Sequence, residues 1–164
     1  MPDWTGFEVQ EERTRLEREA ATILGFMLFE YSRLDMELGL FLSWSDEGSS
    51  LDSLTKKIAG LNFNKRLENL QTSVASKFRD TPSIADAYFA WISDAHSIRE
   101  LRNYLVHGRW GVEPIAQRVV NVVGLPSSPD QSSTPYTIAE LEGHLDRMRQ
   151  LRVRLQELRS SCPV

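Results

Sequence analysis

The stretch WISDAHSIRELRNYLVHGR, residues 91–109, decides the fold. It belongs to an amphipathic helix that we expect to start at Thr81-Pro82 and to end at Gly108, because threonine before proline is typical of helix starts and glycine of helix ends. Apolar side chains recur along this helix at steps of four and three, the spacing of one buried stripe: Ile84, Tyr88, Trp91, Ala95, Ile98 and Leu105. Arg102 occupies one position of the same stripe and interrupts the pattern.

An arginine on a buried stripe requires an anionic partner, because an unpaired guanidinium is costly to remove from water. Asp35 is the predicted partner, since it lies about 40° from Tyr31 around the first long helix and therefore near the apolar seam of that helix. Two interpretations stay open. The ion pair either only joins two helices, or it also holds Arg102 in a functional site.

Other polar side chains surround Arg102 in the sequence. Asn103 and His107 are four residues apart and share one helical face, and Arg99 lies four residues before Asn103. Arg102 and His107 are about 140° apart on an ideal helix, so contact between them requires a changed backbone at Gly108 or a second copy of the helix.

The composition excludes several classes of protein. The 164 residues suffice for one core, and we expect residues 1–164 to form a single domain. A net charge of -4 argues against nonspecific coating of nucleic acid, although Arg99, Arg102 and Arg109 form a candidate basic cluster. A single Cys162 excludes an internal disulfide, and no histidine spacing favours a metal, so we expect no metal and no cofactor. The sequence predicts a cytoplasmic protein without a signal peptide or membrane span.

The pattern predicts an all-α fold with four to five helices. Four further helices are expected at 9–44, at 51–59, from Asn62 or Asn64 to about residue 79, and after a capping box of Thr137 and Glu140. Residues 1–7 are expected to form a flexible tail. An extended insertion at 109–136 separates the last two long helices, with a small β-hairpin within 110–123 and a loop over 124–135.

The first long helix is apolar on two faces. One face carries the main seam, and the opposite face carries Phe26, Phe29, Met36 and Leu40. Such a helix is either central in a bundle or also meets a partner chain, which is a reason to expect a homodimer.

Plainer interpretations apply to several residues. His107 can be a helix-end histidine favoured by the helix dipole, and Asn103 can bond a nearby backbone group. His96 and His144 are interpreted as surface or satisfied histidines. The arginines of the last helix are balanced by nearby acids and are interpreted as a solvated face.

The run Arg102-Asn103-Tyr104-Leu105-Val106-His107 resembles the R-N-x-x-x-H signature of the HEPN superfamily (higher eukaryotes and prokaryotes nucleotide-binding domain). This resemblance implies an up-and-down helical bundle that forms a homodimer, with the Arg and His of both subunits facing a shared cleft. Many members are metal-independent endoribonucleases of toxin–antitoxin or phage-defence systems, whereas others are non-catalytic binding or assembly modules. One subgroup carries a tyrosine two residues after the histidine, which suggests modification by a partner nucleotidyltransferase; this chain has Arg109 there.

The resemblance also implies roles for individual side chains. His107 would act as base or acid on RNA, Arg102 would stabilise the phosphate, and Asn103 would orient His107 or the phosphate. Three residues are expected to support this site: Asp35, Arg99 and Arg109. The expected function is a metal-independent endoribonuclease that acts as a homodimer, with an antitoxin or a nucleotidyltransferase as a candidate partner. The alternative is a non-catalytic helical module that uses the same bundle to dimerise or to bind a partner.

Overall fold

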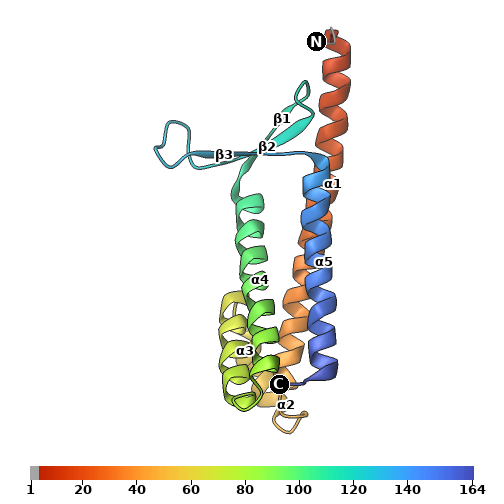
Figure 1. The fold of residues 1–164 in the computed structure, drawn as a ribbon. Coiled ribbons are helices and arrows are strands. Elements are labelled where there is room, and N and C mark those ends of the chain that lie inside the picture. The colour runs from red at the N-terminus through yellow and green to blue at the C-terminus, as the bar shows by residue number, and fades with distance from the viewer. Residues whose placement is uncertain (1–3) are drawn as a thin grey trace. The chain divides into compact units, whose positions relative to one another are not determined.

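The computed structural model describes residues 4–164, which form five helices and three strands (Figure 1). The helices are α1 (Gly6–Ser43), α2 (Leu51–Ala59), α3 (Phe63–Lys77), α4 (Pro82–His107) and α5 (Ile138–Ser161). The strands β1 (Arg109–Glu113), β2 (Arg118–Val123) and β3 (Ser132–Tyr136) lie between α4 and α5 in the sequence. The fold is therefore mostly helical with one small three-stranded sheet, so the prediction of an all-α fold with a small β-hairpin is confirmed only in part.

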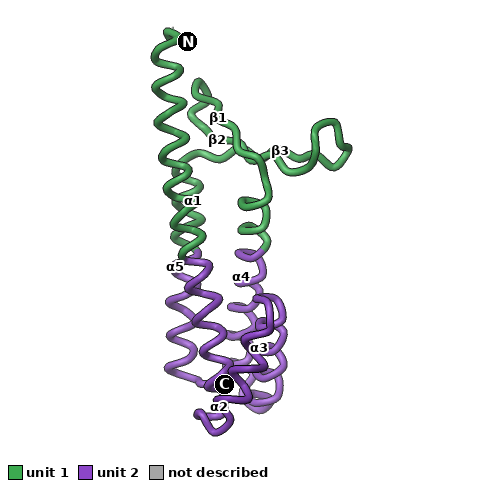
Figure 2. Tube along the Cα trace, turned by 180° about the vertical axis from the view of Figure 1, so that it is seen from behind, with its two compact units in different colours: residues 1–29, 100–147 green, residues 30–99, 148–164 purple. Residues whose placement is uncertain are grey.

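The chain divides into two compact units, which Figure 2 colours separately. Unit 1 comprises Met1–Phe29 and Glu100–Arg147, and unit 2 comprises Glu30–Arg99 and Met148–Val164. Three of the helices, α1, α4 and α5, contribute residues to both units. The expectation of a single domain over residues 1–164 stays a prediction.

Side-chain caps explain where the helices begin. The Asn62 side chain accepts a hydrogen bond from the Lys65 amide at 3.0 Å, and Thr137 and Glu140 form the predicted capping box of α5. A second capping box was missed by the sequence analysis. Thr5 donates its amide to Glu8 and accepts from the Glu8 amide, so α1 begins at Gly6. Residues 6–7 of the predicted flexible tail are consequently helical, and its residues 1–3 lie outside the described residues.

The core of unit 2 confirms the predicted apolar seams of its helices. Buried residues include Leu34 and Leu38 of α1, together with the stripe of α4 from Tyr88 through Trp91 and Ala95 to Ile98. The polar atoms of the two aromatic residues are satisfied at the backbone of the C-terminal segment. Tyr88 donates its hydroxyl to the Cys162 carbonyl at 2.6 Å, and Trp91 donates its indole N–H to the Leu151 carbonyl at 2.8 Å.

Ion pairs in unit 2 correct the interpretation of the arginines of α5. Arg152 donates to Glu37 at 3.0 Å, and its Nε lies 3.2 Å from a carboxylate oxygen of the buried Glu30. Arg154 donates to Asp94 of α4 at 2.6 Å. Two arginines of the predicted solvated face therefore join α5 to α1 and to α4.

The antiparallel sheet of unit 1 has the strand order β1-β2-β3. The β1–β2 pair confirms the predicted hairpin, with Val112 opposite Val119. Strand β3 lies where the sequence analysis expected a loop, because its serines and Pro135 carry no strand signal of their own. Pro135 is tolerated there because β3 is an edge strand, which has no need of every amide.

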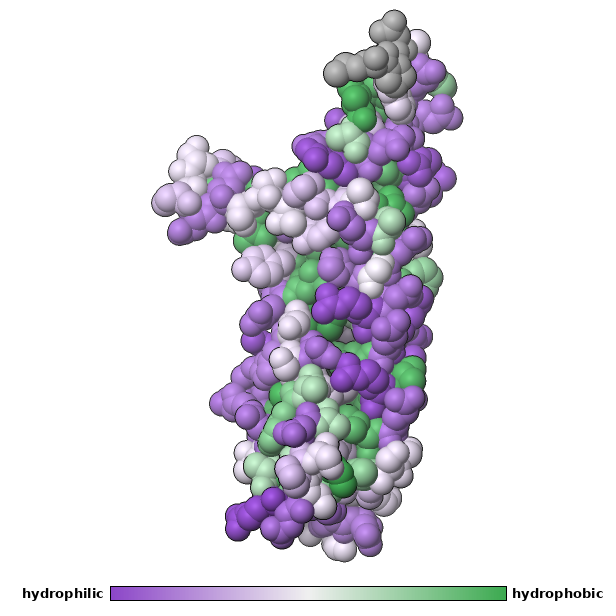
Figure 3. Space-filling model, viewed as in Figure 1, coloured by the Kyte–Doolittle hydropathy of each residue, from purple (hydrophilic) through white to green (hydrophobic). Residues whose placement is uncertain are grey.

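The surface of the molecule is mixed in hydropathy. On the face viewed in Figure 3, the loop between β2 and β3 is mostly hydrophilic or neutral in colour. Within residues 4–164, none of the helices has both the length and the hydropathy needed to cross a membrane.

Candidate functional site

Four of the predicted site residues lie within unit 1, at the end of α4 and the start of β1: Arg102, Asn103, His107 and Arg109. Arg102 is half-buried, and its Nη1 donates a hydrogen bond to Asn103 Oδ1 at 3.2 Å. The side chain of His107 is exposed in the last turn of the helix. The end of α4 therefore offers a guanidinium held beside an amide, together with an imidazole that solvent can reach.

The ion pair predicted between Asp35 and Arg102 was wrong, because Asp35 binds another arginine. Arg66 of α3 donates its Nη1 to the Asp35 carboxylate and to the Asp35 carbonyl, each at 2.8 Å. The same guanidinium approaches Gly39 closely, since Arg66 Nη1 lies 3.0 Å from where a Cβ on this residue would be. Asp35 and the half-buried Arg99, the two remaining candidates, both belong to unit 2.

Asn121 is a site residue that the sequence analysis missed. It lies within β2, and its side chain is 3% exposed. In the amide orientation that satisfies both of its groups, the nitrogen donates to the Tyr104 carbonyl and the oxygen accepts from the indole N–H of Trp110. That indole N–H also lies 3.0 Å from the Leu105 carbonyl. Asn121 and Trp110 thus fasten the last turn of α4, which carries His107, to the sheet.

Gly108 is required by the position of Asn121. A Cβ added at Gly108 would overlap the Asn121 amide, whereas a Cβ added at Gly111 would meet no atom within 4 Å. We expect Gly108→Ala to lower the free energy of unfolding by about 1–3 kcal/mol, the usual cost of overpacking. Urea denaturation measures this loss, and Gly111→Ala is the matched control with little expected change. Equal stability of the two variants would contradict the predicted overlap.

Three aromatic rings follow one another between the sheet and the start of α5. The ring of Trp110 lies 6.0 Å from the ring of Tyr136, which meets His144 edge-on at 5.9 Å. His144 is half-buried, and its Nδ1 has no hydrogen-bond partner among the described residues. Burial lowers the pKa of His144, and the nearby Arg147 lowers it further, whereas Glu140 opposes the change. The interpretation of His144 as a surface or satisfied histidine was therefore wrong.

The lowered pKa of His144 predicts a loss of stability in mild acid. Folding favours the neutral imidazole, so its contribution is full above the ordinary value of 6.5 and is lost as the pH falls through the folded pKa. We expect the free energy of unfolding to fall as the pH drops below the ordinary pKa of 6.5, and His144→Phe to make this fall shallower. Urea denaturation at several pH values measures the slope, with His96→Phe as the control. An unchanged slope in His144→Phe would count against this account. Hydrogen bonds from Thr137 lower the pKa of the Glu140 carboxylate. Protonation of Glu140 therefore lowers the stability only as the pH falls below about 4.5.

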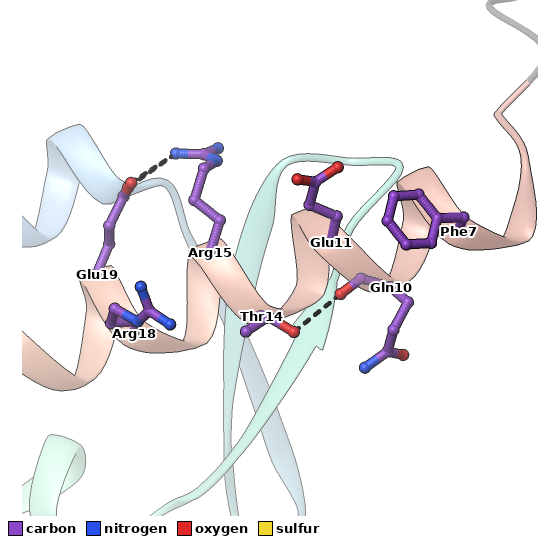
Figure 4. Close-up of a pocket in the computed structure, with 7 residues that line it drawn as sticks. All are labelled: Phe7, Gln10, Glu11, Thr14, Arg15, Arg18 and Glu19. Carbon is purple, nitrogen blue, oxygen red and sulfur yellow. Dashed lines mark hydrogen bonds and ion pairs between the residues drawn. The ribbon is translucent and has the colours of Figure 1, made fainter.

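A hollow of about 530 Å³ on α1 offers no second site. Figure 4 shows its lining side chains along one helix: Phe7, Gln10, Glu11, Thr14, Arg15, Arg18 and Glu19. Arg15 is already held by ion pairs with Glu12 and Glu19. Because one helix supplies the whole lining, the hollow has no opposing wall to enclose a ligand.

Among residues 4–164, no three His, Cys, Asp or Glu side chains gather closely enough to hold a metal ion. No protein-family model, no curated protein and no solved structure matches the chain.

Proposed function

We propose that this chain is a HEPN-type, metal-independent endoribonuclease of a toxin–antitoxin or phage-defence system, with an up-and-down arrangement of its helices. The proposal places it in the cytoplasm as a homodimer, with an antitoxin or a nucleotidyltransferase as its candidate protein partner. One observation carries the proposal: the R-N-x-x-x-H run ends α4 with an exposed His107 and a half-buried Arg102 bonded to Asn103. This arrangement leaves the imidazole free for proton transfer while it fixes the guanidinium.

The proposed reaction uses the 2′-hydroxyl of RNA as the nucleophile. His107 of one copy takes the hydroxyl proton, and the oxygen attacks the adjacent phosphorus. His107 of the second copy protonates the leaving 5′-oxygen, so the products carry a 2′,3′-cyclic phosphate and a 5′-hydroxyl. Arg102 stabilises the charge on the phosphorane through its planar fork, and Asn103 holds that fork in place.

Two further arginines would attract the RNA backbone in this proposal. Arg109 is exposed and uses one of its guanidinium nitrogens to bond the Gly124 carbonyl at 3.1 Å. The other guanidinium nitrogens of Arg109 and the guanidinium of Arg99 would contact phosphates, a contribution that weakens as salt rises.

The experiment that tests this function is cleavage of RNA by the purified protein in excess chelator. We expect cleavage of an RNA oligonucleotide, none of the same oligonucleotide with 2′-deoxyribose throughout, and cyclic phosphate ends in the products by mass spectrometry. Cleavage that the chelator abolishes, or cleavage of the deoxy oligonucleotide, would contradict the proposed chemistry.

A second candidate function is the non-catalytic dimerisation or partner-binding module. It is favoured by the apolar stripe of α1, which stays largely exposed in the single chain: Phe26 is 50%, Phe29 63%, Met36 58% and Leu40 48% exposed. Apolar side chains at such spacing are typical of a helix that meets another chain. The two candidates share this surface and differ only at the end of α4.

The exposed stripe of α1 predicts the oligomeric state. We expect the mass of a dimer in solution at micromolar concentration, and a Kd raised at least about 100-fold in the double variant Phe29→Glu with Met36→Glu, because two large apolar side chains lose their burial. Sedimentation equilibrium measures both. Val153→Glu, on a similarly exposed apolar side chain of α5, is the control. A monomeric wild type, or a double variant that stays dimeric, would contradict the role of the stripe.

A further inference from the structure

The two edges of the sheet in unit 1 differ in how well they are protected. Strand β3 carries Pro135, which has no amide hydrogen and blocks the addition of another strand. Strand β1 pairs only with β2 among the described residues, and it contains no proline. Gly111 at its middle is exposed, with open space where a side chain would begin. An unprotected edge of this kind is a template for a strand from another chain.

A hollow of about 210 Å³ lies beside this edge. Its walls are apolar, with Ala20, Ala21 and Leu24 from α1 and Trp110, Val112 and Val119 from the hairpin. Trp110 and Val112 are two residues apart and so lie on one face of β1. A strand added at the β1 edge would direct alternate side chains toward that same face. The two alanines leave the hollow wide enough for an aliphatic side chain.

Glu17 also lines this hollow, as its one charged residue. Glu17 is exposed, and it has no hydrogen-bond or ion-pair partner among residues 4–164. The neighbouring acids of the same helix differ, because Glu12 and Glu19 both bind Arg15. Glu17 is therefore a negative charge that a ligand can neutralise.

We propose that the β1 groove, formed by the β1 edge and the hollow against α1, binds an extended segment of a partner protein. The segment carries an aliphatic residue and a lysine or arginine two positions apart. Its backbone pairs with β1, its aliphatic side chain enters the hollow between Ala21 and Val112, and its basic side chain meets Glu17.

The chemistry of the groove favours such a segment over two other occupants. A second copy of β1 would turn Trp110 and Val112 toward the hollow, and neither side chain would neutralise Glu17. A nucleic acid would bring phosphates to a carboxylate, which is unfavourable. The groove also adjoins the candidate site, since Trp110 bonds the Leu105 carbonyl of α4, but the proposal does not depend on RNA cleavage.

Peptide binding to the whole chain tests the proposal. The probe is the fluorescein-labelled peptide Ser-Thr-Val-Thr-Lys-Thr-Ser, and fluorescence anisotropy measures its binding. We expect saturable binding that Glu17→Lys and Ala21→Phe each weaken at least about tenfold, since one reverses the charge and the other fills the hollow. Both positions are exposed, so the variants should fold, which circular dichroism checks. Glu11→Lys, another exposed acid of α1, should bind like wild type. Amide exchange of residues 109–113 should slow when the peptide binds.

Several results would overturn the proposal. These are absence of saturable binding up to about 1 mM peptide, and equal binding of a peptide with glutamate in place of lysine. Displacement of the peptide by RNA would assign the groove to nucleic acid. A dimer that Ala21→Phe converts to a monomer would assign it to a second copy of the chain.

Discussion

Replacing His107 with alanine is expected to slow RNA cleavage by about 10²–10⁴-fold, the usual contribution of a positioned general acid or base. The free energy of unfolding should hardly change, because the His107 side chain is exposed. Initial cleavage rates in chelator measure the first effect, and urea denaturation measures the second. Loss of cleavage without loss of stability would separate a chemical role from a structural one.

The companion variants of Arg102 sharpen this result. Arg102→Ala removes the positive charge and is expected to slow RNA cleavage by about 10²–10³-fold. Arg102→Lys retains the charge without the planar fork, so its cleavage rate should lie between those of wild type and Arg102→Ala. His96→Ala, elsewhere on α4, and Arg118→Ala, in an exposed ion pair of β2, are the matched controls with wild-type rates. If His107→Ala cleaved RNA at the wild-type rate, His107 would have no role in the mechanism.

The largest expected loss of stability follows from removing the carboxylate of Glu30. Glu30 is 6% exposed and accepts a hydrogen bond from Arg33 at 2.6 Å, while Arg152 lies 3.2 Å away. Glu30→Ala leaves the half-buried Arg152 with one carboxylate in place of two and opens a gap in the core. We expect the free energy of unfolding to fall by about 3 kcal/mol, as for other buried ion pairs that lose one partner.

A double variant and a surface control test the cause of this loss. Glu30→Leu together with Arg152→Leu should recover most of the stability, because no buried charge is then left unpaired. Glu113→Ala, which breaks the exposed pair with Arg118, should cost no more than about 1 kcal/mol. A loss in Glu30→Ala no larger than in Glu113→Ala would show that the buried network contributes little.

Local signals predicted much of the helical part of the fold. The bounds of α2 and the end of α4 before Gly108 agree with the sequence analysis, because polar breaks and glycines mark them within a few residues. The capping box of Thr5 and Glu8 was an equally local signal that the analysis overlooked. Strand β3 had no such local signal. Its backbone is extended because it pairs with β2, and its own residues do not favour a strand.

The candidate site was predictable only in part. The apolar stripe of α4 correctly predicted that Arg102 is partly buried, because the helical period determines which face of the helix a residue occupies. The sequence could not identify the partner of Asp35. The helical period shows which side of α1 the Asp35 side chain occupies, but it does not show which helix packs against that side. In the structure that helix is α3, which supplies Arg66. The contact of Asn121 with the end of α4 likewise depends on tertiary structure, although one asparagine within the apolar run Val119–Val123 was a usable signal.

The measurement that tests the central claim most directly is chemical rescue of His107→Ala by imidazole. If His107 transfers the proton of the 2′-hydroxyl or of the leaving oxygen, added imidazole should restore RNA cleavage to this variant in a concentration-dependent way, with the same cyclic phosphate products. It should restore none to Arg102→Ala, which lacks a charge rather than a base. No cleavage by the wild-type protein, or equal cleavage by wild type and His107→Ala without imidazole, would contradict the account.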